Sequence, residues 1–165
     1  MSALSPVKCT AMTSATRGDA RALLGAFLAS DEHYRASADV YGDGGIAALE
    51  RALDLFLARP ELGFVWLAQA RYDAVFVTAG ACVVCYAIST SRGSVVAKLD
   101  DVTIRADWQG RGVGNAMLAA LAQELRAKGL SRIDCGCHRD NERAWRFYER
   151  MGFRPLDEER LALLL

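Results

Sequence analysis

The 165-residue sequence lacks an excess of either charge, since 20 lysines and arginines are balanced by 20 aspartates and glutamates. Proteins that bind nucleic acid or anionic membranes usually carry a basic surface, so we expect neither partner. The chain also lacks an apolar run of the about 20 residues that cross a bilayer, and its apolar C-terminal stretch Leu161–Leu165 is far shorter. The N-terminus has a single Lys8 and does not resemble a secretory signal. We expect one cytoplasmic domain over residues 1–165.

Signs of disulfides and metal sites are also scarce. The five cysteines are an odd number and lie in apolar, strand-like runs. Cys82 and Cys85 are three positions apart, so on a strand they face opposite sides. Cys135-Gly-Cys137-His138 has no second ligand pair at the spacing of a zinc site. We therefore expect buried, reduced thiols and no metal.

Alternating strand and helix patterns make up most of the chain. They predict the order β-α-α-β-β-β-α-β-α-β, with short turns between the three central strands. Short turns favour antiparallel pairing, whereas the crossover through the long helix favours one parallel pair. The predicted fold class is therefore α/β, a mixed and mostly antiparallel sheet flanked by helices. The expected strands are residues 7–11, 64–70, 81–89, 95–104, 133–137 and a last one from Phe153; the expected helices start near Thr16, Ile46, Val113 and Glu142.

The most informative segment is Gln109-Gly-Arg-Gly-Val-Gly114, which follows a predicted strand and opens a long predicted helix. Glycine is unfavourable in a helix, but it allows phosphate groups to approach the free N–H groups of the first turn. A tight turn without a ligand is the alternative. A Walker A loop needs Lys-Ser/Thr after the glycines, where this chain has Asn115-Ala116, and a dinucleotide loop needs a third glycine or alanine.

Two motifs together resemble the GNAT N-acetyltransferase superfamily. The first is Q-x-x-G-x-G at Gln109–Gly114, and the second is N-x-x-A-x-x-F-Y-x-x-x-G-F at Asn141–Phe153. The match covers about Val95–Phe153. Within it, Leu99–Ile104 is similar to the L-E-D-x-x-V strand of diamine and polyamine acetyltransferases, with Asp100 in place of glutamate.

The resemblance implies the GNAT fold, acetyl-CoA as donor, a small-molecule amine as acceptor, and no metal. Many family members are dimers, so a homodimer is among the assemblies that it allows. It assigns the pyrophosphate to the glycine turn and the pantetheine arm to the preceding strand and the last helix. The residues so implied in acetyl-CoA binding are Val102, Thr103, Ile104, Gln109, Gly110, Arg111, Gly112, Val113, Gly114, Asn115, Asn141 and Ala144.

The resemblance also implies that Tyr148 is the general acid that protonates the departing thiolate, although a core aromatic residue is the alternative. The acceptor amine must lose a proton, and a carboxylate can take it directly or through water. The resemblance to polyamine acetyltransferases favours Asp100 as this base, and a solvated or salt-bridged pair of aspartates is the alternative. Neighbouring Asp101 normally faces the other side of a strand, and only a β-bulge would change this.

The predicted acceptor-binding residues are Asp31, Glu32, Tyr34 and Asp101, which would bind a cationic substrate. The alternative is that the first three are ordinary polar residues at the end of a helix. His138 is left outside the site. The predicted reaction is acetyl transfer to a primary amine in a ternary complex, with a polyamine-like amine as first candidate and an amino-acid or peptide amine as second. A non-catalytic acyl-CoA-binding regulatory module is the alternative.

Overall fold

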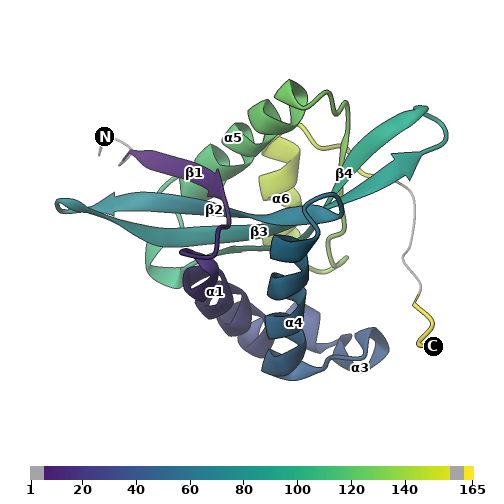
Figure 1. Ribbon diagram of the computed structural model, residues 1–165, viewed down its shortest axis with the longest axis horizontal. Coiled ribbons are helices and arrows are strands. Elements are labelled where there is room, and N and C mark those ends of the chain that lie inside the picture. Colours follow the sequence, from purple (N-terminus) through teal and green to yellow (C-terminus); the bar gives the residue numbers. More distant parts are fainter. Residues whose placement is uncertain (1–5, 157–161) are drawn as a thin grey trace.

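The computed structural model describes residues 6–156 and 162–165 (Figure 1). The strands are β1 (Val7–Ala11), β2 (Gly63–Tyr72), β3 (Val75–Ser89), β4 (Ser94–Ile104) and β5 (Ile133–Cys135). The helices are α1 (Arg17–Ser30), α2 (Glu32–Arg35), α3 (Ala38–Tyr41), α4 (Gly45–Ala58), η1 (Ala106–Trp108, a 3₁₀ turn), α5 (Val113–Ala127) and α6 (Glu142–Arg150). None of the described helices is both long and apolar enough to cross a bilayer.

The five strands form one sheet in the order β1-β2-β3-β4-β5. The first three pairs are antiparallel. Tight turns join β2 to β3 and β3 to β4, whereas β1 and β2 are connected through the helices α1 to α4. β4 and β5 are joined through α5 and run parallel, with Ala97 opposite Ile133 and Leu99 opposite Cys135. The predicted mixed sheet with one parallel pair is therefore confirmed.

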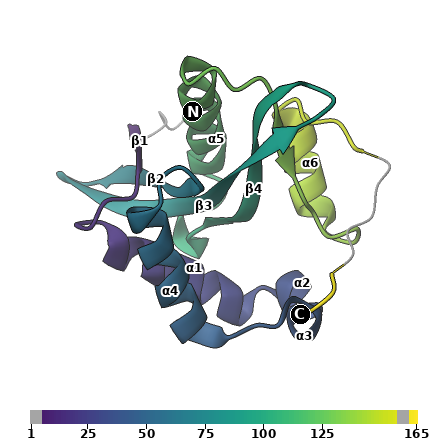
Figure 2. The same ribbon diagram turned by 45° about the vertical axis from the view of Figure 1, so that its right-hand side comes forward.

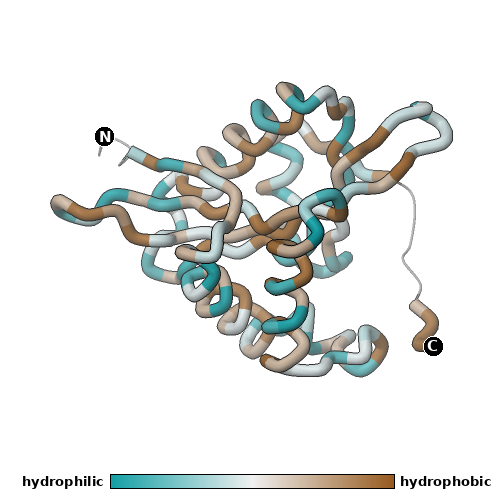
Figure 3. Tube along the Cα trace, in the orientation of Figure 1, coloured by the Kyte–Doolittle hydropathy of each residue, from teal (hydrophilic) through white to brown (hydrophobic). Residues whose placement is uncertain are grey.

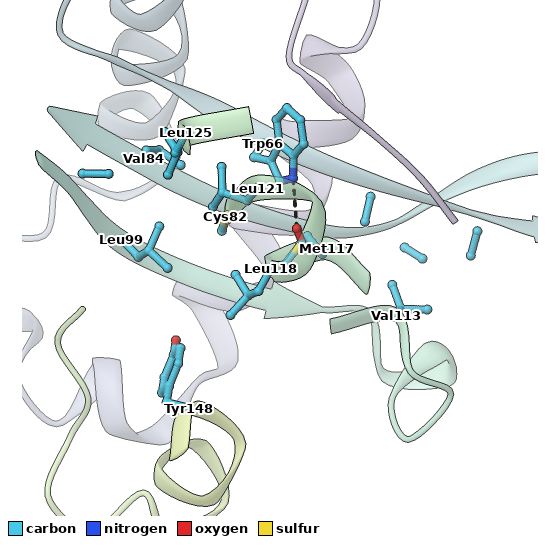
Figure 4. Packing of buried hydrophobic residues seen from close by; sticks show 14 of the residues in the cluster. Trp66, Cys82, Val84, Leu99, Val113, Met117, Leu118, Leu121, Leu125 and Tyr148 are labelled. Atoms are coloured by element: carbon cyan, nitrogen blue, oxygen red, sulfur yellow. Dashed lines mark hydrogen bonds between the residues drawn. The ribbon is translucent and has the colours of Figure 1, made fainter. Parts of the chain in front are cut away.

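Helices cover both faces of the sheet (Figures 1 and 2). α5 and α6 lie on one face, and α1 and α4 lie on the other together with the short helices α2 and α3. On the α5 face, Trp66 and Met117 are buried, and the Trp66 indole N–H donates to the Met117 carbonyl at 3.2 Å (Figure 4). On the α1 face, Leu24, Leu53 and Leu67 are almost fully buried. Each such side chain stabilises the fold by roughly 1.5–3 kcal/mol through burial.

The chain after α6 differs from the sequence prediction. Phe153–Leu156 and residues 162–165 form no strand, so the predicted last strand is absent from the described part of the chain, and its remaining residues, 157–161, lie outside that part. Residues 162–165 are uniformly hydrophobic (Figure 3) yet exposed. A second difference is α3, which periodicity alone did not predict because a four-residue helix has no repeating pattern.

The five cysteines are free thiols, as predicted, but only Cys82 is fully buried. Cys137 lies in the connection after β5 rather than on a strand. Burial raises the pKa of Cys135 to about 11. Burial also raises the pKa of the Cys137 thiol, so both thiols stay protonated near neutral pH.

The sheet opens between β4 and β5. Their parallel ladder ends at Leu99 and Cys135, whereas β4 continues to Ile104. In the same place β4 carries one extra residue relative to β3, and Asp101 adopts a left-handed backbone with φ of 46°. This β-bulge bends β4 away from β5. A split in the sheet results, with one edge of β4 facing it.

Candidate functional site

The glycine turn lies at the N-terminus of α5. Gly110 and Gly112 have φ of 73° and 79°, a region that side-chain-bearing residues avoid, and Gly112 is the N-cap of the helix. No side chain caps this helix, and none of the described residues accepts a hydrogen bond from the backbone N–H groups of residues 110–115. Several unpaired donors at the positive end of a 15-residue helix form a site for an anion such as a pyrophosphate.

Gly114 has a different requirement from Gly112. A Cβ atom on Gly114 would lie 3.3 Å from the Phe147 ring and 3.6 Å from Ile104 Cγ1. Glycine is needed there because α5, α6 and the end of β4 meet closely. The sequence-based explanation, room for phosphate oxygens, overlooked this packing role.

Two polar residues fix the turn. Gln109 donates from its amide Nε2 to the Ile104 carbonyl at 2.9 Å, so its side chain ties the turn to the end of β4. The Arg111 guanidinium lies 5.2 Å from the centre of the buried Trp108 ring, a cation–π contact. Arg111 thereby keeps a positive charge beside the free N–H groups of the turn.

Residues Val102, Thr103 and Ile104 lie on the part of β4 beyond the ladder with β5. Thr103 and Ile104 pair with β3 on one side. No described strand pairs with the other side, so this edge is open to an extended ligand whose amides bind like a peptide strand.

The α6 helix places Asn141 and Tyr148 beside the split. Asn141 caps the helix, since its Oδ1 accepts from the Ala144 N–H at 3.1 Å, which leaves its NH₂ group as a donor. Tyr148 is only 8% exposed and packs against Phe147 and Phe153, with ring centres 5.3 and 5.4 Å away. Figure 4 shows its hydroxyl directed toward Leu99 on β4.

Burial raises the pKa of Tyr148 far above its usual range, with smaller contributions from the neighbouring thiols of Cys135, Cys137 and Cys82. The hydroxyl therefore holds its proton at any physiological pH. This state is the one that a proton donor requires.

Both aspartates of the bulge face the α1 side of the sheet. Leu99 and Val102 belong to the core cluster on the α5 face, so strand alternation is shifted across the two residues between them. Asp100 lies opposite Val83, which packs on the α1 face, and Asp101 lines a cavity on that face. Both charges also raise the pKa of the Cys85 thiol there, after the larger effect of burial. The β-bulge, which the sequence left open as an alternative, is therefore present, and it brings both aspartates to one face.

A cavity of about 240 Å³ lies on this α1 face, and we name it the α2–α4 cavity. Two of the four predicted acceptor residues, Tyr34 and Asp101, line it. Asp31 does not, because its side chain caps α2 by accepting from the Tyr34 N–H at 2.8 Å. Glu32 is also outside, with a side chain that is 88% exposed.

The sequence analysis missed Tyr41 and Asp43, which also line the α2–α4 cavity. The Tyr34 and Tyr41 rings are stacked, with centres 5.7 Å apart and planes within 6°. The only signal in the sequence is the glycine-rich segment Gly42-Asp-Gly-Gly45, which indicates a break in the chain and not a binding site.

The two histidines of the chain also meet. His33 on α2 stacks on His138, which precedes α6, with ring centres 5.0 Å apart. His138 had been left outside the site. The contact joins the short helices to the α6 side of the split. The described residues contain no group of three His, Cys, Asp or Glu side chains arranged to hold a metal ion.

Two curated proteins are similar to part of the chain. The mycothiol acetyltransferase of Nocardiopsis dassonvillei is 36% identical over 67 residues, which are 41% of this chain and 20% of that protein. The glucosamine 6-phosphate N-acetyltransferase of Trypanosoma brucei brucei is 31% identical over 70 residues, which are 42% of this chain and 46% of that protein. The matched segments thus span less than half of either relative.

The fold agrees with a solved acetyltransferase structure. AAC(6')-Iy, in complex with the bisubstrate analog CoA-S-monomethyl-acetylneamine, has a TM-score of 0.73 at 15% identity, covering 98% of this chain and 99% of that one. None of these three proteins is named as a diamine or polyamine acetyltransferase. The model of the acetyltransferase (GNAT) family matches residues 29–153, well over half of the sequence. The chain therefore belongs to the acetyltransferase (GNAT) family.

Proposed function

We propose that this protein transfers the acetyl group of acetyl-CoA to a primary amine by direct attack in a ternary complex. The observation that carries the proposal is the split between β4 and β5. An uncapped glycine turn lies at the end of β4, and a buried, protonated tyrosine lies on the helix beside the split.

The donor site fits the chemistry of acetyl-CoA. The free N–H groups of residues 110–115, with Arg111 beside them, are the donors for its pyrophosphate. The open edge at Val102–Ile104 and the Asn141 NH₂ group are positioned for the amides of its pantetheine arm. Acetyl-CoA supplies an acyl group activated as a thioester.

Tyr148 is the proposed general acid. As the amine nitrogen bonds to the acetyl carbon, the carbon–sulfur bond breaks and the sulfur leaves with its electron pair. The Tyr148 hydroxyl donates a proton to that sulfur, and its buried, neutral state keeps the proton available. The amine nitrogen loses one proton on the acceptor side, and Tyr148 regains one from solvent after the thiol leaves, so that protons balance over the turnover.

Asp100 is the proposed acceptor of the proton from the amine, directly or through a water molecule. An alkylamine with a pKa near 10.4 is mostly charged at neutral pH, and forming the free base costs roughly 4–5 kcal/mol. The bulge directs Asp100 and Asp101 toward the face that carries the α2–α4 cavity. A negative charge there favours entry of the ammonium form and then removal of its proton.

A non-catalytic acyl-CoA-binding module is the second candidate, since the same turn and strand edge serve binding alone. Two measurements separate them: calorimetry with acetyl-CoA, and thiol release from acetyl-CoA with diamines, amino acids, aminoglycosides and short peptides. Binding with turnover of one amine class supports the enzyme. Binding without turnover of any acceptor supports the module, and absence of binding contradicts both.

A further inference from the structure

The charged residues that line the α2–α4 cavity are all acidic. Among the described residues that line it there is no lysine, arginine or histidine, and the ionised groups are the carboxylates of Asp43 and Asp101. Leu28 and Leu49 contribute apolar surface. Such a cavity suits a cation carried on a hydrocarbon stem and disfavours an anion.

The negative charges of Asp43 and Asp101 both affect the Tyr34 hydroxyl. The pKa of the Tyr34 hydroxyl is raised, first by burial and then by the negative charges of Asp43 and Asp101, so both carboxylates influence the same point. Asp43 is held in place because its Oδ1 accepts from the Gly45 N–H at 2.8 Å. The second carboxylate oxygen, Oδ2, is outside this hydrogen bond and can accept one from an ammonium group.

The aromatic wall adds to this preference. Tyr34 and Tyr41 lie nearly parallel, within 6°, and both line the cavity. The face of a tyrosine ring attracts an ammonium group within about 6 Å of its centre. The volume of about 240 Å³ is below that of a pocket for a whole drug-sized ligand, so it suits one end of a small acceptor.

Asp101 connects the cavity to the reaction. It lines the cavity and directly follows Asp100, the proposed base, within the bulge. An acceptor held in the cavity by one positive group therefore extends its other amine along β4 toward the split.

We propose that the α2–α4 cavity is the specificity subsite for an acceptor that carries a second positive charge, a linear diamine or a longer polyamine. This inference rests on the proposed acetyl transfer and names its substrate class. Acceptors that carry a phosphate meet two carboxylates there and are rejected.

The test compares butane-1,4-diamine with n-butylamine, which has the same stem and only one charge, and with glucosamine 6-phosphate. In the wild-type protein kcat/KM for the diamine is expected to exceed that for the monoamine by about tenfold, since only the diamine carries a second charge that can pair with the carboxylates. Asp43→Asn keeps the Oδ1 acceptor for Gly45 and removes the charge. It is expected to lower kcat/KM for the diamine about tenfold and to leave the monoamine within twofold.

Asp39→Asn is the matched control, because Asp39 is exposed on α3 and does not line the cavity. It is expected to change neither substrate. Tyr41→Leu is expected to weaken the diamine selectively, whereas Tyr41→Phe keeps the ring and the preference.

Calorimetry with the diamine in the absence of acetyl-CoA tests the subsite separately from the proposed acetyl transfer. Diamine binding that Asp43→Asn weakens supports the subsite even in a protein that turns nothing over. Acetylation of other amines with equal activity on diamine and monoamine overturns the subsite alone. Equal loss for both substrates in Asp43→Asn, or a preference for the phosphorylated sugar, also overturns it.

Discussion

The two faces of the sheet differ in how their sites are built. On the α5 face, the glycine turn is six consecutive residues on one well-packed helix end, supported by Trp108 and Phe147. On the α1 face, the α2–α4 cavity is assembled from α1, two four-residue helices, a glycine turn, α4 and a bulge. The first arrangement is fixed by local sequence, and the second depends on how separate segments meet. The donor site is thus formed by one contiguous segment, whereas the acceptor side needs several separate segments to come together.

The largest expected effect tests the α5 face at Tyr148. Tyr148→Phe keeps the ring packed against Phe147 and Phe153 and removes only the hydroxyl. General acid catalysis contributes about 10²–10⁴-fold, so kcat is expected to fall by about 10²-fold or more with acetyl-CoA affinity unchanged. Steady-state kinetics and calorimetry measure the two quantities.

Tyr86→Phe is the control for this change, because Tyr86 is a partly buried tyrosine that packs against the same core, beside Phe64. Its kcat is expected to stay within twofold of wild type. An active Tyr148→Phe protein would show that Tyr148 is only a core aromatic residue.

The next effect tests the α1 face at the bulge. Asp100→Asn removes the proposed base and is expected to lower kcat by about 10²-fold. Asp101→Asn keeps a residue that tolerates the left-handed backbone and is expected mainly to raise KM for a cationic acceptor. Equal kinetic profiles of the two variants would contradict the distinct roles given to these neighbours.

A smaller effect separates the two glycines of the turn. In Gly112→Ala, the alanine must adopt φ of 79°, which costs roughly 1–2 kcal/mol and weakens acetyl-CoA binding at the N–H groups. In Gly114→Ala, the added Cβ meets Phe147 and Ile104, and overpacking costs roughly 1–3 kcal/mol of folding stability.

Urea unfolding and calorimetry on both variants distinguish these origins. Gly112→Ala is expected to lose more affinity relative to its stability loss than Gly114→Ala. The reverse order would show that packing, rather than backbone conformation, controls the donor site.

The contrast between the faces also explains what the sequence could predict. Strand and helix periodicity, the short turns and the crossover were sufficient for the mixed sheet, and the two contiguous motifs located the glycine turn and α6. The side of the sheet that Asp100 and Asp101 face was not predictable, because the bulge arises from pairing β4 with β3. The pairs that flank it, Val83 with Asp100 and Ala81 with Thr103, are 17 and 22 residues apart in the sequence. Tyr41 and Asp43 were missed because a cavity between short helices leaves no periodic signal.

The smallest expected effect is the pH dependence of stability that Tyr148 contributes. Its pKa is raised in the folded state by burial, whereas in the unfolded chain it is about 10. Above that pH the unfolded state releases a proton that the folded state retains, so the folded state binds more protons and stability falls as pH rises. Below about pH 10 both states are protonated and the contribution is constant.

Urea unfolding of wild type and Tyr148→Phe at pH 8 and at pH 10.5 isolates the effect, since the other tyrosines are common to both. The wild-type protein is expected to lose more stability between the two values, and an equal loss would show that the Tyr148 hydroxyl is not shielded from solvent.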